Sequence, residues 1–120
     1  MLYAVLCYNY ESVVCAWSTE EEDAVIAKHA AATQNLAAQG KLGPVARLMP
    51  TTTATTVRTG PKPMVIDGPF AETKEQLLGF YIFDCATLED AITAARDLLD
   101  ETGALEIRPI ATSYSGGALT

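Results

Sequence analysis

Residues 65–75 read Val-Ile-Asp-Gly-Pro-Phe-Ala-Glu-Thr-Lys-Glu and separate two apolar segments of the chain. The stretch begins as the end of one strand, breaks at Asp67-Gly68-Pro69, and leads into the most apolar segment, residues 77–83. Gly68 can adopt backbone angles that other residues avoid, and Pro69 has no N–H to donate to a strand ladder. An aspartate before such a break can accept hydrogen bonds from free backbone N–H groups. The sequence therefore predicts a rigid corner between two strands, with the Asp67 carboxylate placed at it.

Helix and strand signals alternate on either side of this corner. Ser18 and Glu21 form a capping box that predicts a helix over residues 19–39, ended by Gly40. A second helix is expected to begin at Thr87 and to end at Gly103, with Leu88, Ile92, Ala95 and Leu99 on its inward side. The expected strands are residues 2–8, 42–48, 54–59, 63–67, 77–84 and 104–110, with a turn at 60–62 and a loop or ragged strand extension over 9–17.

This order of elements predicts the fold class. It reads strand–helix–strand, an inserted hairpin, then strand–helix–strand, which is typical of an α+β, ferredoxin-like fold written βαβ-(ββ)-βαβ. Both helices would lie on one face of an antiparallel sheet. Strands 2–8 and 77–84 are apolar on both faces, so the second face also needs a cover. We expect a second copy of the chain to supply it, which makes the protein a homodimer.

Composition limits the classes of function. The chain of 120 residues has room for one domain, expected over residues 1–110 with a C-terminal tail over 111–120 that would fray without a partner. Its net charge of −7 disfavours direct nucleic-acid binding. No segment approaches the about 18 apolar residues of a membrane span. Three cysteines without a pairing pattern indicate the reducing cytoplasm. One histidine and no metal, phosphate or dinucleotide motif predict no metal and no cofactor.

The corner also carries a family resemblance. Residues 67–75, followed by Leu-Gly-Phe-Tyr at 78–81, resemble the signature of the YCII-related domain in its DGPF subgroup (DGPFAETKE). The first strand, the helix that holds His29, residues 54–58 and the closing Glu-Ile-Arg-Pro at 106–109 fit the same pattern, so the resemblance extends to about Ile110. Residues 9–17 and the tail depart from it.

This resemblance implies a dimeric α/β barrel built from ferredoxin-like halves. Members of the subgroup are often linked to extracytoplasmic-function sigma factors and are described as regulators. Some relatives carry a His and an Asp proposed as an acid–base pair, and one type of relative eliminates chloride from a chlorinated aromatic. The matching residues in this chain are His29 and Asp67. The resemblance supplies a fold and a candidate site, and no substrate.

The candidate catalytic residues are therefore His29 and Asp67, and each has a structural alternative. His29 lies on the apolar stripe of the first helix with Val25, Ala32 and Leu36, so it should point at the sheet as an acid or base oriented by Asp67. The alternative is a half-buried histidine with one ordinary partner. Asp67 could serve only as a turn cap. Candidate ligand contacts are Glu72, Lys74 and Tyr81; the first two could instead be solvated charges, and the tyrosine a core residue.

Three functions remain open at this point. The first is a small-molecule enzyme or ligand-binding domain, with a cleft between the first helix and the Asp67 corner and a cofactor-independent elimination or isomerisation. The second is a non-catalytic regulatory module that binds a sigma-factor-linked protein partner. The third is a structural dimer without a ligand. A His29 perturbed by a carboxylate and by a small acidic or phenolic compound would favour the first function over the other two.

Overall fold

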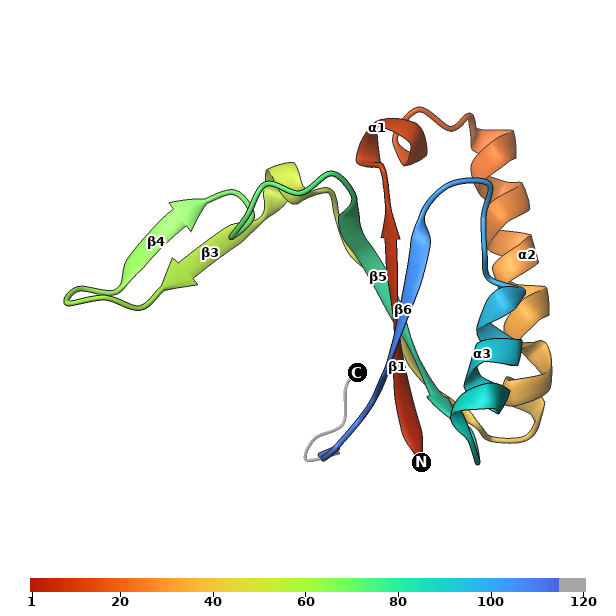
Figure 1. Ribbon diagram of the computed structural model, residues 1–120. Helices are drawn as coiled ribbons and strands as arrows, with labels where there is room; N and C mark the ends of the chain where they lie inside the picture. The colour runs from red at the N-terminus through yellow and green to blue at the C-terminus, as the bar shows by residue number, and fades with distance from the viewer. Residues whose placement is uncertain (115–120) are drawn as a thin grey trace.

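A computed structural model of the chain describes residues 1–114 (Figure 1). Its elements in chain order are β1 (Leu2–Asn9), α1 (Glu11–Val14), α2 (Thr19–Ala38), β2 (Leu42–Arg47), the 3-10 turn η1 (Thr51–Thr53), β3 (Thr55–Arg58), β4 (Met64–Asp67), β5 (Gln76–Asp84), α3 (Leu88–Arg96) and β6 (Ala104–Pro109). The part of the tail prediction that concerns residues 115–120 lies outside the described residues. Among residues 1–114, no helix is both long enough and apolar enough to cross a bilayer.

Four strands form one antiparallel sheet in the order β2-β5-β1-β6. The central strand β1 pairs with β5 on one side and with β6 on the other, so Val5 lies between Tyr81 and Ile107. Helices α2 and α3 lie on the same side of this sheet (Figure 1). The α+β, ferredoxin-like fold predicted from the order of elements is confirmed.

The helix α2 begins where the sequence places it. The backbone N–H of Glu21 donates to Ser18 Oγ at 3.1 Å, and the Ser18 N–H donates back to Glu21 Oε1 at 3.2 Å. The helix ends at Ala38, and Gly40 follows with a φ of 69°, a left-handed conformation that glycine adopts at little cost. The predicted inward stripe, which includes His29 and Leu36, is half-buried against the sheet.

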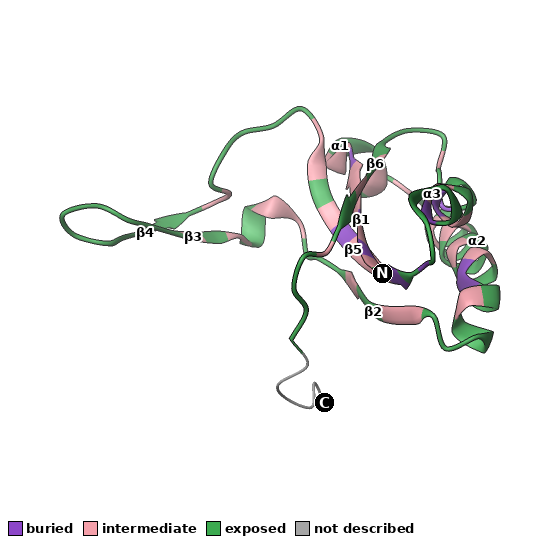
Figure 2. Cartoon of the chain, turned by 60° about the horizontal axis from the view of Figure 1, so that its bottom comes forward, coloured by how far each residue is buried: buried purple, intermediate pink, exposed green. Residues whose placement is uncertain are grey.

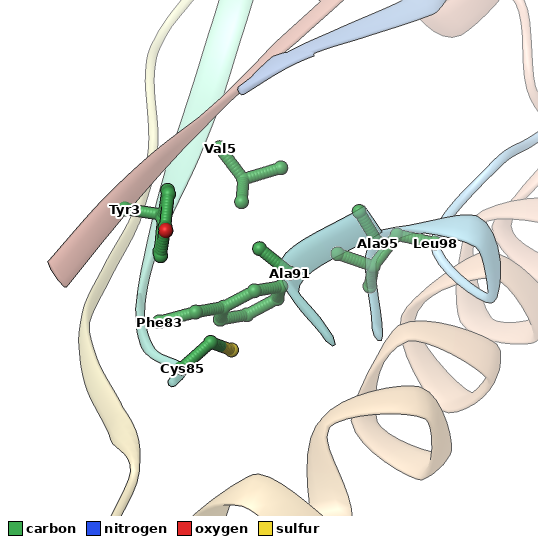
Figure 3. Packing of buried hydrophobic residues seen from close by; sticks show 7 residues of the cluster. All are labelled: Tyr3, Val5, Phe83, Cys85, Ala91, Ala95 and Leu98. Atoms are coloured by element: carbon green, nitrogen blue, oxygen red, sulfur yellow. The ribbon is translucent and has the colours of Figure 1, made fainter. Parts of the chain in front are cut away.

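The core occupies one end of the space between sheet and helices. Figure 3 shows the ring of Phe83, from β5, directed at Ala91 of α3, with Val5 of β1 nearby. The buried apolar residues are Tyr3, Val5, Phe83, Cys85, Ala91, Ala95 and Leu98. Small alanines on the inner side let α3 approach the sheet closely.

Two sequence predictions need correction. The predicted inner stripe of the second helix included Leu88 and Leu99, but these side chains are 47% and 45% exposed. The helix ends at Arg96, well before Gly103, and the chain turns so that Leu98 points inward instead. In addition, the expected loop over residues 9–17 contains the short helix α1.

The predicted hairpin forms a separate two-stranded sheet, in which Thr55 lies opposite Asp67. It projects from the four-stranded sheet on the side away from the helices (Figures 1 and 2). The corner after it is fixed by Gly68, whose φ is 107° and whose N–H donates to the Ala54 carbonyl at 2.7 Å. Thr56 Oγ1 donates to the Gly68 carbonyl at 2.8 Å. The break predicted at Gly68 is therefore present, held by backbone geometry.

We predict that Gly79→Ala destabilises the fold by about 1–3 kcal/mol, as overpacking of a filled site does. Gly79 lies on β5 between β1 and β2, and a Cβ there would come within 2.6 Å of the Ala46 carbonyl oxygen. The β2–β5 pairing would have to open. Urea denaturation measures the change. Gly60→Ala is the matched control, because its Cβ would meet nothing closer than 3.4 Å. Equal stability of the two variants would contradict this packing.

Candidate functional site

A cavity of about 340 Å³ lies between α2 and the sheet, at the end away from the core. It exists because α3 is short and lies beside only one half of the sheet, whereas α2 runs along its whole length (Figure 1). Most of the wall is apolar, with Trp17 before α2, Ile26 on the helix, and Leu105 on β6 among its residues. A cavity of this size with a few polar groups in apolar walls is typical of a small-molecule site.

His29 and Asp100 form the polar centre of this cavity. His29 Nε2 lies 3.0 Å from Asp100 Oδ1, and the two side chains are 24% and 17% exposed. The helix α2 supplies His29, and the loop between α3 and β6 supplies Asp100. A carboxylate accepts a hydrogen bond from an imidazole N–H, so Asp100 fixes the ring with its proton on Nε2. Nδ1 of the neutral ring then carries the free lone pair.

Asp100 is held from a second direction by Lys28, the residue before His29. Lys28 Nζ lies 3.8 Å from Asp100 Oδ1 and donates to the carbonyl oxygen of Leu99. Gly103, with a φ of 101°, ends the same loop, and a Cβ there would lie 2.5 Å from the Tyr8 carbonyl oxygen. The loop that carries Asp100 is thus tied to α2 at one point and packed on the end of β1 at another.

Two protonated side chains lie beside the pair. Burial, and then the charge of Asp100, raise the pKa of the Cys7 thiol to about 11. Burial also raises the pKa of Tyr81, with smaller contributions from Cys7 and Asp100. The Tyr81 ring meets His29 edge-on at a centroid distance of 6.4 Å. At neutral pH the cavity therefore holds a thiol in place of a thiolate nucleophile, and a phenol O–H able to donate a hydrogen bond.

Arg47 lies at the margin of the cavity. It comes from β2, and its Nη1 lies 2.5 Å from Glu22 Oε1 of α2. The Arg47 side chain is 59% exposed, so part of the guanidinium remains open to a ligand. Among the described residues, it is the one Lys or Arg side chain that lines this mainly apolar cavity. Within residues 1–114, no group of three or more His, Cys, Asp or Glu side chains is placed to hold a metal ion.

The predicted site residues divide into two groups. His29 and Tyr81 line the cavity. Asp67 is exposed on β4, and Glu72 and Lys74 are exposed in the segment that follows. Within one chain, the structure does not bring Asp67 to His29, because the hairpin projects away from α2 (Figure 1). The roles of Asp67, Glu72 and Lys74 stay predictions.

Sequence reasoning missed Asp100. One signal could have found it. Asp97, Asp100 and Glu101 would all lie at the C-terminal end of the second helix if that helix ran on toward Gly103. The helix dipole disfavours acidic residues there. A run of acidic residues at that place indicates that the helix stops early. It also indicates that one of the carboxylates binds a side chain elsewhere in the fold.

Comparison with known proteins identifies the family. A family model of the YCII-related domain matches residues 1–112. The chain belongs to the YCII-related domain family. This YCII-related chain is also 55% identical, over 123 aligned positions, to an uncharacterised protein of Rhizobium meliloti (strain 1021), and the match covers 99% of this chain and 98% of the relative. The resemblance noted at the corner sequence is thereby confirmed at the level of the family, and the DGPF subgroup stays a prediction.

The hydrogen bond between His29 and Asp100 predicts one tautomer of the YCII-related chain's single histidine. In the neutral wild type, ¹⁵N NMR should show the proton on Nε2. Asp100→Ala should remove this preference and give a mixture of tautomers. Asp97→Ala is the control, since Asp97 is an exposed acid of the same loop. A wild-type ring protonated on Nδ1 would contradict the observed geometry.

The raised pKa of Cys7 predicts slow alkylation of its thiol. With a pKa of about 11 in place of 9.0, about 100-fold less thiolate is present at pH 8. Mass spectrometry after iodoacetamide treatment should show Cys15, which is exposed, reacting first. Cys7 alkylation should become fast only as the pH approaches 11. Equal alkylation rates for Cys7 and Cys15 at pH 8 would refute the raised pKa of Cys7.

The same shift affects the stability of the fold. Because the pKa of Cys7 in the folded chain lies above its ordinary value, the free energy of unfolding should fall as the pH rises above 9.

Proposed function

We propose that this YCII-related chain is a homodimeric, cofactor-independent domain that binds a small molecule and uses His29 as an acid–base group. The observation that carries the proposal is the 3.0 Å contact between His29 Nε2 and Asp100 Oδ1 inside an apolar cavity. The reaction class it supports is an elimination or isomerisation that begins with removal of a proton from carbon. The three free cysteines support a reducing compartment, the cytoplasm.

The proposed chemistry assigns one task to each group. Asp100 holds the Nε2–H of His29 and stabilises the imidazolium that forms when Nδ1 takes a proton from the substrate. In an elimination, the electron pair of the broken C–H bond forms the new double bond and the leaving group departs with its own pair. Tyr81 remains protonated and can donate a hydrogen bond to developing negative charge.

The cavity also limits the size, polarity and charge of the ligand. A volume of about 340 Å³ accommodates one substituted ring or a molecule of similar size. Apolar walls favour an apolar body, and Arg47 at the margin favours one anionic or acidic group. The ligand class proposed is a small, mainly apolar acid or phenol.

The homodimer is part of the proposal because it accounts for the groups that one chain leaves outside the cavity. Asp67, Glu72 and Lys74 are exposed on the hairpin corner. In a dimer, an exposed segment of one chain can meet the other chain. We keep Asp67 as a second acid–base candidate, and Glu72 and Lys74 as ligand contacts, in that assembled state.

A second candidate is a non-catalytic regulatory module that binds a protein partner linked to an extracytoplasmic-function sigma factor. The exposed apolar side chains of the hairpin and of the segment after it, such as Val57 and Phe70, favour a protein contact. The acidic chain would then act on transcription only through that partner. A cavity that binds no small molecule, together with a hairpin essential for partner binding, would favour this function over the first.

The ring-opening elimination of 5-nitrobenzisoxazole, a small aromatic carbon acid, tests the proposed base directly. We expect the wild-type chain to accelerate it above free imidazole, and His29→Gln to lose most of that activity, since a placed general base contributes about 10²–10⁴-fold. Asp100→Ala should retain a reduced rate, and Asp97→Ala should match the wild type. A His29→Gln variant as fast as the wild type would overturn the assignment of His29 as the base.

A further inference from the structure

An ion pair between Glu22 and Arg47 lies in the wall of the cavity that holds His29. Both residues line the cavity, and Arg47 Nη1 of β2 lies 2.5 Å from Glu22 Oε1 of α2. Glu22 and His29 are seven residues apart on α2, so they point from the same face of the helix, about two turns apart. Their backbones are therefore separated by about 10 Å along the helix axis.

The floor of the cavity has a gap between Cys7 and Arg47. Gly79 of β5 pairs with Cys7 of β1 on one side and with Arg47 of β2 on the other. Residues directly opposite one another share a face of the sheet, and all three line the cavity. Because neighbouring strands lie about 4.8 Å apart, the backbones of Cys7 and Arg47 are about 10 Å apart, with only a glycine between them. A flat ligand can therefore lie across Gly79.

The guanidinium of Arg47 has more donors than Glu22 uses. A guanidinium carries several N–H donors in a planar fork. Within residues 1–114, the contact with Glu22 Oε1 is the one side-chain hydrogen bond that Arg47 makes. The Arg47 side chain is 59% exposed, so its remaining donors are open to solvent. A ligand carboxylate can accept two parallel N–H bonds from such a fork, which the single contact with Glu22 does not provide.

A second carboxylate lies close by, but it is engaged elsewhere. Glu11 and Arg47 both line a neighbouring cavity of about 310 Å³. Glu11 Oε1 accepts a hydrogen bond from the Thr51 backbone N–H at 2.6 Å, and Glu11 Oε2 accepts one from Thr51 Oγ1 at 2.7 Å. Among the described residues, Glu22 is therefore the carboxylate that a ligand would have to replace on Arg47.

The two acidic side chains of the cavity differ in how firmly they are held. The Glu22 side chain is 39% exposed, so water screens its pair with Arg47, and such exposed pairs contribute little to stability. Glu22 can turn into solvent without leaving a buried charge behind. Asp100, in contrast, is 17% exposed and contacts both His29 and Lys28. Asp100 is thus the fixed carboxylate, and Glu22 the exchangeable one.

We propose that Arg47 is the subsite for the acidic group of the ligand, and that Glu22 occupies this subsite until the ligand displaces it. The carboxylate of a small aromatic acid binds the guanidinium, its ring lies across Gly79, and its other end faces His29. Because an acid must first displace Glu22 and a neutral ligand need not, Glu22 determines how strongly the cavity selects acids. This inference rests on the proposed small-molecule site and adds the residue that regulates entry to it.

NMR titration of the full chain with 4-methylbenzoate, and with its neutral analogue 4-methylbenzamide, tests the inference. Arg47→Gln should weaken binding of the acid about tenfold, because charge-assisted hydrogen bonds are lost. Glu22→Gln should strengthen binding of the acid about two- to fivefold, which is the range expected for an exposed ion pair. Neither change should alter the dissociation constant of the amide.

Glu20→Gln is the matched control for charge. It removes the same charge from the first turn of α2, but Glu20 is exposed and does not line the cavity. Its dissociation constants for the acid and the amide should equal those of the wild type. A gain in acid binding as large as that of Glu22→Gln would overturn the inference.

The double variant Glu22→Gln/Arg47→Gln separates displacement from simple charge repulsion. If Glu22 competes with the ligand for Arg47, the gain from Glu22→Gln disappears once the guanidinium is removed. An equal gain with and without Arg47 would mean that Glu22 only repels the anion, and the displacement would be refuted. Equal binding of the acid and the amide by Glu22→Gln would refute the Arg47 subsite itself.

These titrations do not depend on the proposed proton transfer. Selective binding of the acid, together with no elimination of 5-nitrobenzisoxazole by the wild type, would refute the acid–base chemistry and leave the subsite standing. If the chain binds neither benzoate nor benzamide but still eliminates 5-nitrobenzisoxazole, the subsite fails and the proposed chemistry stands.

Discussion

The structure depends on one mismatch: two helices cover only one face of a sheet whose central strands are apolar on both. On the covered side, the packing of Phe83 against Ala91 closes one end of the space between sheet and helices. The helix α3 is too short to close the other end, and the cavity with His29 remains there. On the bare side, the same mismatch leaves half-exposed apolar strands. Both the candidate site and the uncovered face of the sheet thus arise from how little helix lies against this sheet.

The sequence predicted those parts of the fold that interactions between neighbouring residues determine. The capping box at Ser18 and the glycines at 40 and 68 specify their own backbone geometry, so they appear where predicted. The sheet order β2-β5-β1-β6 places no consecutive strands side by side, so it was predicted only through the ferredoxin-like order of helices and strands along the chain. The rotation of α3 could not be predicted in the same way. Its apolar residues fit two neighbouring stripes, and only contact with the sheet selects Ala91 and Leu98 over Leu88 and Leu99.

The candidate site likewise contains one residue that the local sequence pattern predicted and one that it did not. The helical stripe placed His29 toward the sheet because periodicity is a local property. Its partner Asp100 lies 71 residues away in the sequence, in a loop whose path depends on where α3 ends. The motif at the corner points to Asp67, whereas the carboxylate that contacts the imidazole lies in a short acidic run that belongs to no motif. A motif marks where the backbone is constrained, and chemistry can lie elsewhere.

The close approach of Gly103 to the Tyr8 carbonyl has a consequence for how this protein could be altered. The loop before Gly103 is anchored at its last position, where any added side chain would collide with β1. Asp97 and Glu101, by contrast, face solvent. Divergence or laboratory evolution can therefore change those exposed positions of the loop while residue 103 stays glycine. Gly103 keeps the Asp100 carboxylate in place against the His29 imidazole while the exposed residues of the loop change.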